Sequence, residues 1–402
     1  MARILIFTGK GGVGKSSISS AHAIRSAREG KKTILVSTDR AHNLADIFER
    51  KIGREVTNIE DCLDAIELDP ETIMRQDYSN FMEAITKLLA SPGIAVDGGE
   101  QTFMFPGLEE LFSLLKIADL EESGEYDRII VDCAPTGETL ALLKFPELLG
   151  WYMEKLFPVG RMAVRVLAPI ARSKYKIDLP DAKGMNDIEK LYARLINLQK
   201  LLKDPERTSV RIVAIPEKMV VEETKRSFMY LNLYGYHVDG IYINRILPEG
   251  EPDDFFAEWR QIQKVYRAEL EEVFANKPIY PVPWYETDLR GESGIARISE
   301  DALRDERIFD VIAKAEGEFF EKVREGYRLT IPIPLAQKGD LHLSTNGHDV
   351  ILRLGNYKRS IPLPTTLTAY EISSAKLEDG RLRIRFASAS PSDAQQGKEE
   401  NV

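Results

Sequence analysis

The sequence predicts an α/β fold, in which a mainly parallel sheet carries helices on both faces, followed by a small all-β domain. Two observations carry this prediction. Apolar strand-like runs alternate with helix-like segments to about residue 326, as in a parallel sheet. From Tyr327 the chain changes to short alternating segments with turn signals such as Asn346-Gly347 and Asp379-Gly380.

The first strand and helix flank a glycine-rich loop. Arg3–Thr8 reads as a short buried strand, and Ser16–Glu29 reads as a helix of small and apolar residues. The loop between them has Walker A spacing and consists of Gly9, Lys10, Gly11, Gly12, Val13, Gly14, Lys15, Ser16 and Ser17. A strand, a glycine-rich turn and a helix form the context of a phosphate-binding loop, so a P-loop nucleoside-triphosphatase fold is favoured over a turn that binds nothing.

The chemistry of phosphate binding explains these residue types. Glycines let backbone N–H groups converge on an anion, and the helix N-terminus adds partial positive charge. Lys15 would reach the β- and γ-phosphates, and the Ser16 hydroxyl would hold Mg²⁺. We therefore expect ATP or ADP and Mg²⁺ as ligands.

Composition limits the class of protein. The chain has 402 residues and a net charge of −10, which disfavours a general role in binding nucleic acid. No apolar run approaches membrane-spanning length. The two cysteines, Cys62 and Cys133, form no CxxC pair, so we expect neither a disulfide framework nor zinc. A cytoplasmic protein is expected, with an organelle stroma after removal of a targeting segment as the alternative.

Lys10 makes the loop more specific, because an ordinary Walker A loop requires no lysine at its second position. The run GKGGVGKSS resembles the deviant Walker A loop of the partition, septum-site, nitrogenase-iron-protein and arsenite-pump ATPases. In those families the extra lysine crosses a dimer interface to the partner's nucleotide. The resemblance therefore implies a homodimer with ATP between subunits, and a catalytic role for Lys10 beside Lys15.

A second strand, Thr33–Ser37, runs into a segment with an acid. Thr38–Leu44 resembles the switch I motif of the tail-anchored-protein targeting ATPases and the arsenite-pump ATPases, with Arg40 in place of a proline. The resemblance implies that Asp39 polarises the attacking water and lies near Mg²⁺. A helix N-cap is the structural alternative for Asp39. His42 is left open between a switch residue and an ordinary loop histidine.

The strand Tyr126–Asp132 also ends in an acid. In a P-loop fold Asp132 takes the Walker B position and holds Mg²⁺ through water. Asp132–Leu140 resembles the switch II motif of the same family, with Glu138 where the family has histidine.

Three later strands end near further candidate nucleotide-binding residues. Strands are expected at Val210–Ile215, Asp239–Asn244 and Pro278–Val282. The resemblance places an acid after the first, an adenine-binding asparagine after the second and a loop that brackets the base after the third. These positions are held by Glu217, by Asn244, and by Pro283 and Trp284.

An inserted helical subdomain is expected at about 70–125 and 147–205, with a loop over Lys174–Asp187 and a helix over Ile188–Leu202. Glu147–Ala171 is unusually apolar, with helical spacing. This composition suits a groove for a hydrophobic helix or membrane-protein client, and a plain core is the alternative. A membrane receptor is a further candidate partner.

The last part of the chain has three expected segments. Asp305–Gly326 reads as a helix that closes the ATPase domain, which covers 1–326. Asp379–Ile384 resembles the end of an α-crystallin domain of small heat-shock proteins, so residues 327–387 are expected to form an α-crystallin-like sandwich. Ser388–Val402 is polar and is expected to be a disordered tail.

Taken with the resemblance, these features predict a homodimeric Mg²⁺-dependent ATPase that captures and releases a hydrophobic client, as a targeting factor or a chaperone-like protein. An arsenite-efflux ATPase subunit is one alternative, but it would need a cluster of cysteines to sense the metalloid. A partition or septum-site positioning ATPase is another, but it would carry basic residues for DNA or a terminal amphipathic helix for membrane.

Overall fold

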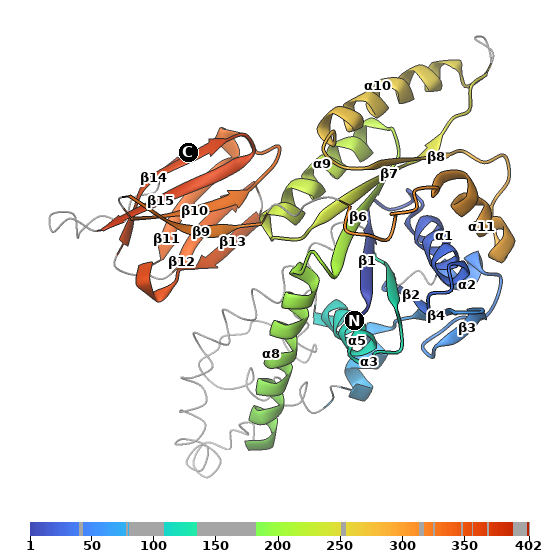
Figure 1. The fold of residues 1–402 in the computed structure, drawn as a ribbon, viewed down its shortest axis with the longest axis horizontal. Helices are drawn as coiled ribbons and strands as arrows, with labels where there is room; N and C mark the ends of the chain where they lie inside the picture. Colours follow the sequence, from blue (N-terminus) through green and yellow to red (C-terminus); the bar gives the residue numbers. More distant parts are fainter. Residues whose placement is uncertain are drawn as a thin grey trace, which may run out of the picture. The chain divides into compact units, whose positions relative to one another are not determined.

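The computed structural model shows two compact units. They consist of Met1–Thr208 with Tyr285–Arg304, and of Ser209–Trp284 with Asp305–Val402 (Figure 1). The structure describes residues 1–39, 43–77, 79, 108–134, 182–250, 255–312, 317–324, 326–346, 349–355, 357–367, 370–388 and 400–401. Among these residues no helix is long and apolar enough to cross a bilayer.

The first unit contains five strands in the order β3-β4-β2-β5-β1. Their bounds are β1 Arg3–Thr8, β2 Thr33–Ser37, β3 Thr57–Glu60, β4 Leu63–Glu67 and β5 Arg128–Asp132. All neighbours pair in parallel except β3 and β4. β1, β2, β4 and β5 are almost wholly buried, which explains their continuous apolar sequences. Because the strands are parallel, the chain leaves β1, β2 and β5 at one edge of the sheet.

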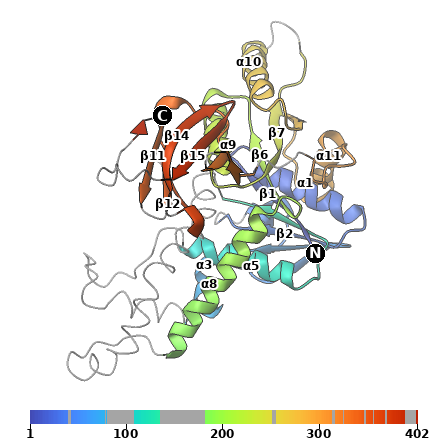
Figure 2. The ribbon, with the colours of Figure 1, turned by 60° about the vertical axis from the view of Figure 1, so that its left-hand side comes forward.

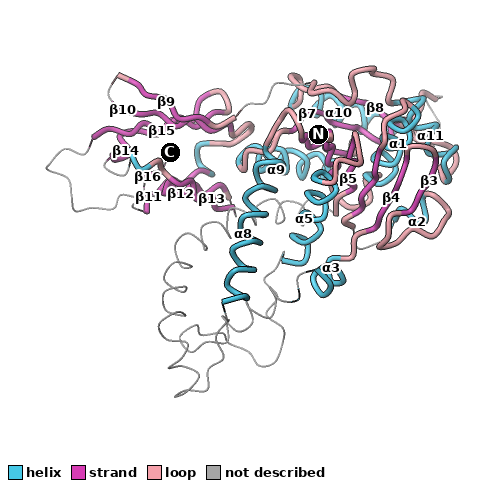
Figure 3. Tube along the Cα trace, turned by 60° about the horizontal axis from the view of Figure 1, so that its bottom comes forward, coloured by secondary structure: helices cyan, strands magenta, loops and turns pink. Residues whose placement is uncertain are grey.

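Helices cover both faces of this sheet. Figure 3 shows α1 (Lys15–Arg28) and α11 (Gly291–Ala302) on one side and α5 (Leu108–Glu122) and α8 (Ala182–Lys203) on the other. The long helix α8 runs beside α5 in Figure 2. Two shorter helices, α2 (Asn43–Ile47) and α3 (Pro70–Asp77), follow β2 and β4. The predicted P-loop fold is confirmed in this unit.

The second unit begins with three parallel strands, β6 (Thr208–Ala214), β7 (Val238–Ile246) and β8 (Ile279–Pro283). They are joined by α9 (Lys218–Leu233) and α10 (Ala257–Val273).

A buried polar network links these three strands. The Nε of Arg211 on β6 donates to Asp239 Oδ1 at 3.1 Å, and its Nη1 donates to the Tyr242 hydroxyl at 3.0 Å. Tyr242 stacks on Tyr280, whose hydroxyl donates to Asp305 at 3.3 Å. Arg211 and Asp239 are fully buried, so each compensates the other's charge.

The remaining strands form two antiparallel sheets with the orders β14-β15-β10-β9 and β13-β12-β11-β16. The strands are β9 Phe319–Val323, β10 Gly326–Pro332, β11 Leu341–Asn346, β12 Asp349–Leu354, β13 Tyr357–Pro362, β14 Tyr370–Glu378, β15 Arg381–Ser388 and β16 Glu400–Asn401. Short 3-10 turns lie at Lys338–Asp340 and Thr365–Leu367. The predicted all-β C-terminal fold is confirmed.

The β domain is fastened to α9 within the same unit. Arg359 of β13 is 5% exposed, and its Nη1 donates to the carbonyl of Leu233, the last residue of α9, at 2.6 Å. The same guanidinium pairs with Glu318 at 2.6 Å. The rings of Tyr230 and Tyr357 lie 3.7 Å apart. A positive charge at the C-terminal carbonyls of a helix also interacts favourably with the helix dipole, which stabilises α9.

Three sequence predictions were wrong. The helix expected over Asp305–Gly326 is a strand at Phe319–Val323, because these residues alternate and pair with β10. Helix α8 begins at Ala182, inside the expected loop Lys174–Asp187. The expected tail contains Ser388 at the end of β15 and Glu400–Asn401, which pair with β11.

Candidate active site

The loop after β1 is shaped by glycines at left-handed backbone angles. Gly12 has φ +79°, and Gly14 has φ +95° at the position before α1. Residues other than glycine rarely adopt these backbone angles. No side chain caps α1, so its first N–H groups lack the partner that a capping residue would supply. This arrangement is the backbone cradle expected for a phosphate group.

Both lysines of the loop lie at this cradle. Lys15 is 5% exposed, although it carries a charge, and its Nζ donates to the carbonyl of Lys10 at 3.3 Å. Lys10 itself is half-buried. Ser16 and Ser17 occupy the first turn of α1 and are also half-buried. The structure therefore brings all the predicted loop residues together at the N-terminus of one helix.

Asp132 is the most unusual group at this edge. It is fully buried at the end of β5, and neither carboxylate oxygen has a hydrogen bond of normal geometry among the described residues. Burial raises the pKa of Asp132 to about 7. Ser16 and Lys15 offset part of this effect, whereas the nearby charge of Asp39 adds to it. The three predicted phosphate and metal residues are therefore neighbours of Asp132.

Asp39 is held near this carboxyl group by backbone hydrogen bonds. The N–H of Thr38 donates to the carbonyl of Asp132 at 2.9 Å, and the N–H of Asp39 donates to the Ser37 hydroxyl at 3.3 Å. On the other side of β5, the N–H of Cys133 donates to the carbonyl of Phe7 at 3.1 Å. These hydrogen bonds connect the ends of β2, β5 and β1. The alternative role of Asp39 as a helix N-cap stays a prediction.

Two further buried oxygens at this edge have no partner among the described residues. They are the hydroxyls of Thr8, at the end of β1, and Thr38, directly after β2. With both oxygens of Asp132, they form a set of unsatisfied acceptors at the carboxyl ends of three adjacent strands. Buried polar groups normally have partners, so such a set marks the place of water, an ion or a polar ligand.

This donor set fits magnesium. Carboxylate and hydroxyl oxygens are the ligands that Mg²⁺ takes, usually one or two of them together with water and phosphate. The described residues contain no group of three or more His, Cys, Asp or Glu that could hold a metal by themselves. The carboxylate of Asp132 beside the Ser16 hydroxyl, with Asp39 nearby, agrees with a nucleotide-dependent Mg²⁺ site rather than a closed protein cage.

Glu67 is a residue of this region that the sequence analysis missed. It ends β4 and is 2% exposed, and its Oε1 accepts hydrogen bonds from the N–H groups of Leu44 at 2.8 Å and Ala45 at 3.1 Å. Glu67 thereby anchors the last residue of the predicted switch I segment, Leu44, and the residue that follows it. Its only sequence signal is an acid at the end of a buried strand.

The predicted base-binding residues lie in the second unit. The N–H of Trp284 donates to the carbonyl of Ile246 at 2.8 Å, which joins the loop after β8 to the end of β7, two residues beyond Asn244. Trp284 is 48% exposed, and Pro283 is the last residue of β8. The structure thus brings Asn244, Pro283 and Trp284 to the neighbouring ends of β7 and β8.

Glu217, the third predicted nucleotide-binding position, lies at the start of α9 rather than at the ends of β7 and β8. It takes the N-cap position of α9 with φ −130°, but its side chain makes no capping hydrogen bond and is exposed. Its predicted contact with nucleotide stays a prediction.

Several predicted segments lie outside the described residues. They are Arg40–His42 of switch I, switch II from Pro135 to Leu140 with Glu138, and the apolar stretch Glu147–Ala171.

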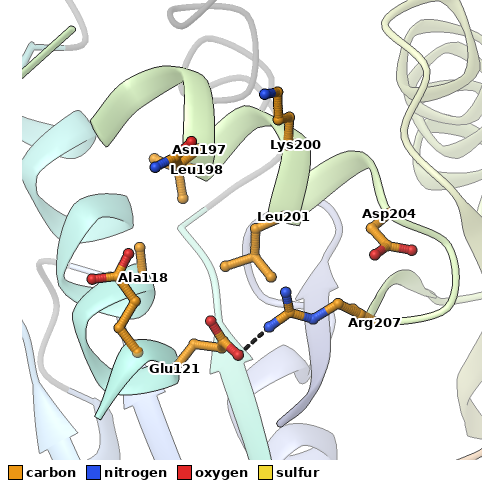
Figure 4. Close-up of a pocket in the computed structure, with 9 residues that line it drawn as sticks. Ala118, Glu121, Asn197, Leu198, Lys200, Leu201, Asp204 and Arg207 are labelled. Atoms are coloured by element: carbon orange, nitrogen blue, oxygen red, sulfur yellow. Dashed lines mark hydrogen bonds and ion pairs between the residues drawn. The ribbon is translucent and has the colours of Figure 1, made fainter. Parts of the chain in front are cut away.

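A hollow of about 290 Å³ lies between α5 and α8 (Figure 4). Glu121 and Arg207 form an ion pair across it, and Lys200 and Asp204 also line it. None of the predicted site residues lines this hollow. Its charges are partly paired with each other.

Comparisons with known proteins agree with this geometry. A family model described as "Anion-transporting ATPase" matches residues 2–304, and one described as "HSP20-like domain found in ArsA" matches residues 324–386. The chain is 33% identical to the "Putative arsenical pump-driving ATPase" of Chlorobaculum tepidum, over 96% of each chain. It is 32% identical to a similarly named protein of Aquifex aeolicus, over 95% of this chain and 99% of that protein. It is 30% identical to "ATPase GET3" of Chaetomium globosum, over 74% of this chain and 89% of that protein.

Proposed function

The chain belongs to the anion-transporting ATPase family, and we propose from this premise that it is a homodimeric, Mg²⁺-dependent enzyme that couples ATP hydrolysis to capture and release of a hydrophobic client. ATP hydrolysis follows from the family itself. The observation that carries the proposal is the set of buried, unsatisfied oxygens of Thr8, Thr38 and Asp132 at the carboxyl ends of β1, β2 and β5.

The first part of the mechanism is binding of the triphosphate. The N–H groups at the start of α1 would donate hydrogen bonds to the phosphate oxygens, and Lys15 would exchange the carbonyl of Lys10 for the β- and γ-phosphates. Ser16 and Asp132 would hold Mg²⁺, Asp132 through water, and the ion would neutralise phosphate charge when bound. Asp132 must lose its proton to do this. Burial raises its pKa to about 7, and a bound Mg²⁺ would lower that pKa by compensating the negative charge of the carboxylate.

The second part is activation of water. Asp39 lies beside Asp132 and is half-buried, so its carboxylate can hold a water molecule at the phosphate edge of the site. In phosphoryl transfer, positioning and charge stabilisation supply most of the rate. Lys10, on the same loop, would add positive charge in the dimer.

The dimer and the client rest on likeness and composition. Lys10 is the residue that a single P-loop does not require, and relatives named GET3 share most of the ATPase region. The apolar stretch Glu147–Ala171 lies outside the described residues, so its role as a groove is a proposal from its sequence.

A trapped nucleotide state tests the coupling. In the Asp39→Asn variant loaded with Mg²⁺-ATP, a fluorescent hydrophobic helical peptide should bind, and loading with ADP should release it. A polar helical peptide of equal length is the control. Equal binding of the hydrophobic peptide in both nucleotide states would contradict the proposal.

An arsenite-efflux ATPase subunit is the second candidate, favoured by the names of the relatives that span almost the whole chain. A metalloid site built from thiolates is disfavoured, because the chain has two cysteines in all. Cys133 is 1% exposed after β5, whereas Cys62 lies in the turn between β3 and β4. Stimulation of ATP hydrolysis by arsenite would decide for this candidate, and unchanged hydrolysis would decide against it.

A partition or septum-site positioning ATPase is the third candidate, and the net charge of −10 disfavours it. Nucleotide-dependent binding to DNA or to liposomes would support it.

A further inference from the structure

The end of β7 is bulged between the two segments predicted to contact the base. Arg245 has φ +57°, an angle that few residues other than glycine adopt. The register between β7 and β8 shifts between Ile243 and Ile246. The side chain of Asn244 turns back on this bulge, since its Oδ1 accepts the N–H of Arg245 at 2.8 Å. Strained backbone of this kind persists only where its surroundings hold it.

Gln263 of α10 holds the bulge on both sides. Its Nε2 donates to the carbonyl of Arg245 at 3.0 Å, and its Oε1 accepts the N–H of Leu247 at 3.0 Å. Ile246 lies between Arg245 and Leu247, and its carbonyl points away from Gln263 and accepts the N–H of Trp284. One amide side chain therefore fixes the direction of the peptide groups before and after the link to Trp284.

We propose that Gln263 is a positioning residue for the nucleotide base: by clamping the bulge, it sets how Asn244 and Trp284 are presented to that base. This inference rests on the proposed ATPase function. Gln263 acts through the backbone, and no contact of its own with nucleotide is needed. Its amide suits the task because it offers one donor and one acceptor at the same time.

A merely structural role for Gln263 predicts something different. Hydrogen bonds that only fasten α10 would affect the melting temperature and leave nucleotide affinity unchanged. A positioning role predicts weaker binding of the base with unchanged turnover, because the phosphate-binding residues lie on other elements. The split between KM and kcat therefore separates the two roles.

The test uses the full chain with the variants Gln263→Ala and Gln263→Glu. Gln261→Ala is the matched control, because Gln261 is exposed on the same helix. Loss of both hydrogen bonds in Gln263→Ala should raise KM for ATP about tenfold, with kcat changed by less than about twofold. The ratio of kcat/KM for ATP to that for GTP should fall, since a loosened loop discriminates the bases less.

The Gln263→Glu variant dissects the clamp. A carboxylate keeps an acceptor for the N–H of Leu247 but cannot donate to the carbonyl of Arg245. We expect KM for ATP to rise by less than in Gln263→Ala, and amide hydrogen exchange at Leu247 to have an intermediate rate. In Gln263→Ala the Leu247 amide should exchange fastest, which reports loss of the clamp without any nucleotide.

The outcomes are distinct. Faster exchange at Leu247 with wild-type KM and wild-type ATP-to-GTP preference would overturn the inference, as would a fall in kcat equal to the rise in KM. Absence of ATP hydrolysis in the wild-type chain would instead overturn the proposed function.

Discussion

Two regions with proposed ligand contacts are built in opposite ways: the phosphate edge of the first unit, at the carboxyl ends of β1, β2 and β5, and the base loops of the second unit, at the ends of β7 and β8. At the phosphate edge, the carboxylate oxygens of Asp132 and the hydroxyls of Thr8 and Thr38 are buried without hydrogen bonds of normal geometry among the described residues. In the base loops, Trp284 is half exposed, and Gln263 satisfies the backbone around Arg245. The first region has buried oxygens that the described residues do not pair, whereas the second is held in shape by the chain itself.

This difference predicts how substitutions act. Groups at the phosphate edge would find their partners in the bound phosphate and Mg²⁺, where the reaction takes place. Removing such a group should therefore lower kcat. Groups that shape an exposed loop affect how well the base is held, and this changes KM. Variants of the two regions should therefore differ in which kinetic constant they change.

Asp39→Asn should give the largest effect. An amide cannot accept the proton of the attacking water, so kcat should fall by about two to three orders of magnitude while ATP still binds. Phosphate release and binding of a fluorescent ATP analogue measure the two properties. Asp46→Asn is the control, because Asp46 is exposed on the neighbouring helix α2. Wild-type turnover in Asp39→Asn would remove Asp39 from the mechanism.

Asp132→Asn should change how stability depends on pH. The pKa of Asp132 is raised from 3.8 to about 7 in the folded chain, so the folded state holds a proton that the unfolded state releases. The stability from this proton is complete below pH 3.8 and is lost as pH rises to about 7. Across that window, the melting temperature of the nucleotide-free wild type should fall relative to Asp132→Asn. The same dependence of melting temperature on pH in the two proteins would contradict the raised pKa.

Lys10→Ala should weaken dimer closure more than nucleotide binding. The Lys10 side chain is not required by its own P-loop, and its carbonyl can still meet Lys15 after truncation. Sedimentation with a non-hydrolysable ATP analogue should show fewer dimers for Lys10→Ala than for Lys31→Ala, a control at an exposed lysine after α1. Dimer content equal to the wild type would refute a crossing lysine.

Trp284→Ala should give the smallest effect. Trp284 is the proposed stacking surface for the base, so its loss should raise KM for ATP by about tenfold or less, with kcat little changed. Trp259→Ala is a close control, since Trp259 is a tryptophan of similar exposure on α10. If both variants raise KM equally, Trp284 has no special contact with the base.

The two regions also differ in how far the sequence predicts them. The loop from Gly9 to Ser17 is local, so its spacing and flanking strand and helix predicted its position, and the strand ends predicted the positions of Asp39 and Asp132. The roles of these residues stay predictions. The clamp on Arg245 joins it to Gln263 on another element, and Glu67 meets Leu44 across a similar gap in the chain. No local pattern reports such contacts.

The β domain shows the same limit. Its turns were visible in the sequence, but β9 was predicted as helix because a strand at Phe319–Val323 is defined by its pairing with β10. The fastening of Arg359 to the end of α9 likewise depends on residues far apart in the chain.

The most direct test of this account is a side-by-side measurement of kcat and KM for ATP in Asp39→Asn and Trp284→Ala. We predict that Asp39→Asn loses turnover with KM close to the wild-type value, and that Trp284→Ala keeps turnover with a raised KM. Loss of kcat in Trp284→Ala as large as in Asp39→Asn would contradict the separation of the phosphate edge from the base loops.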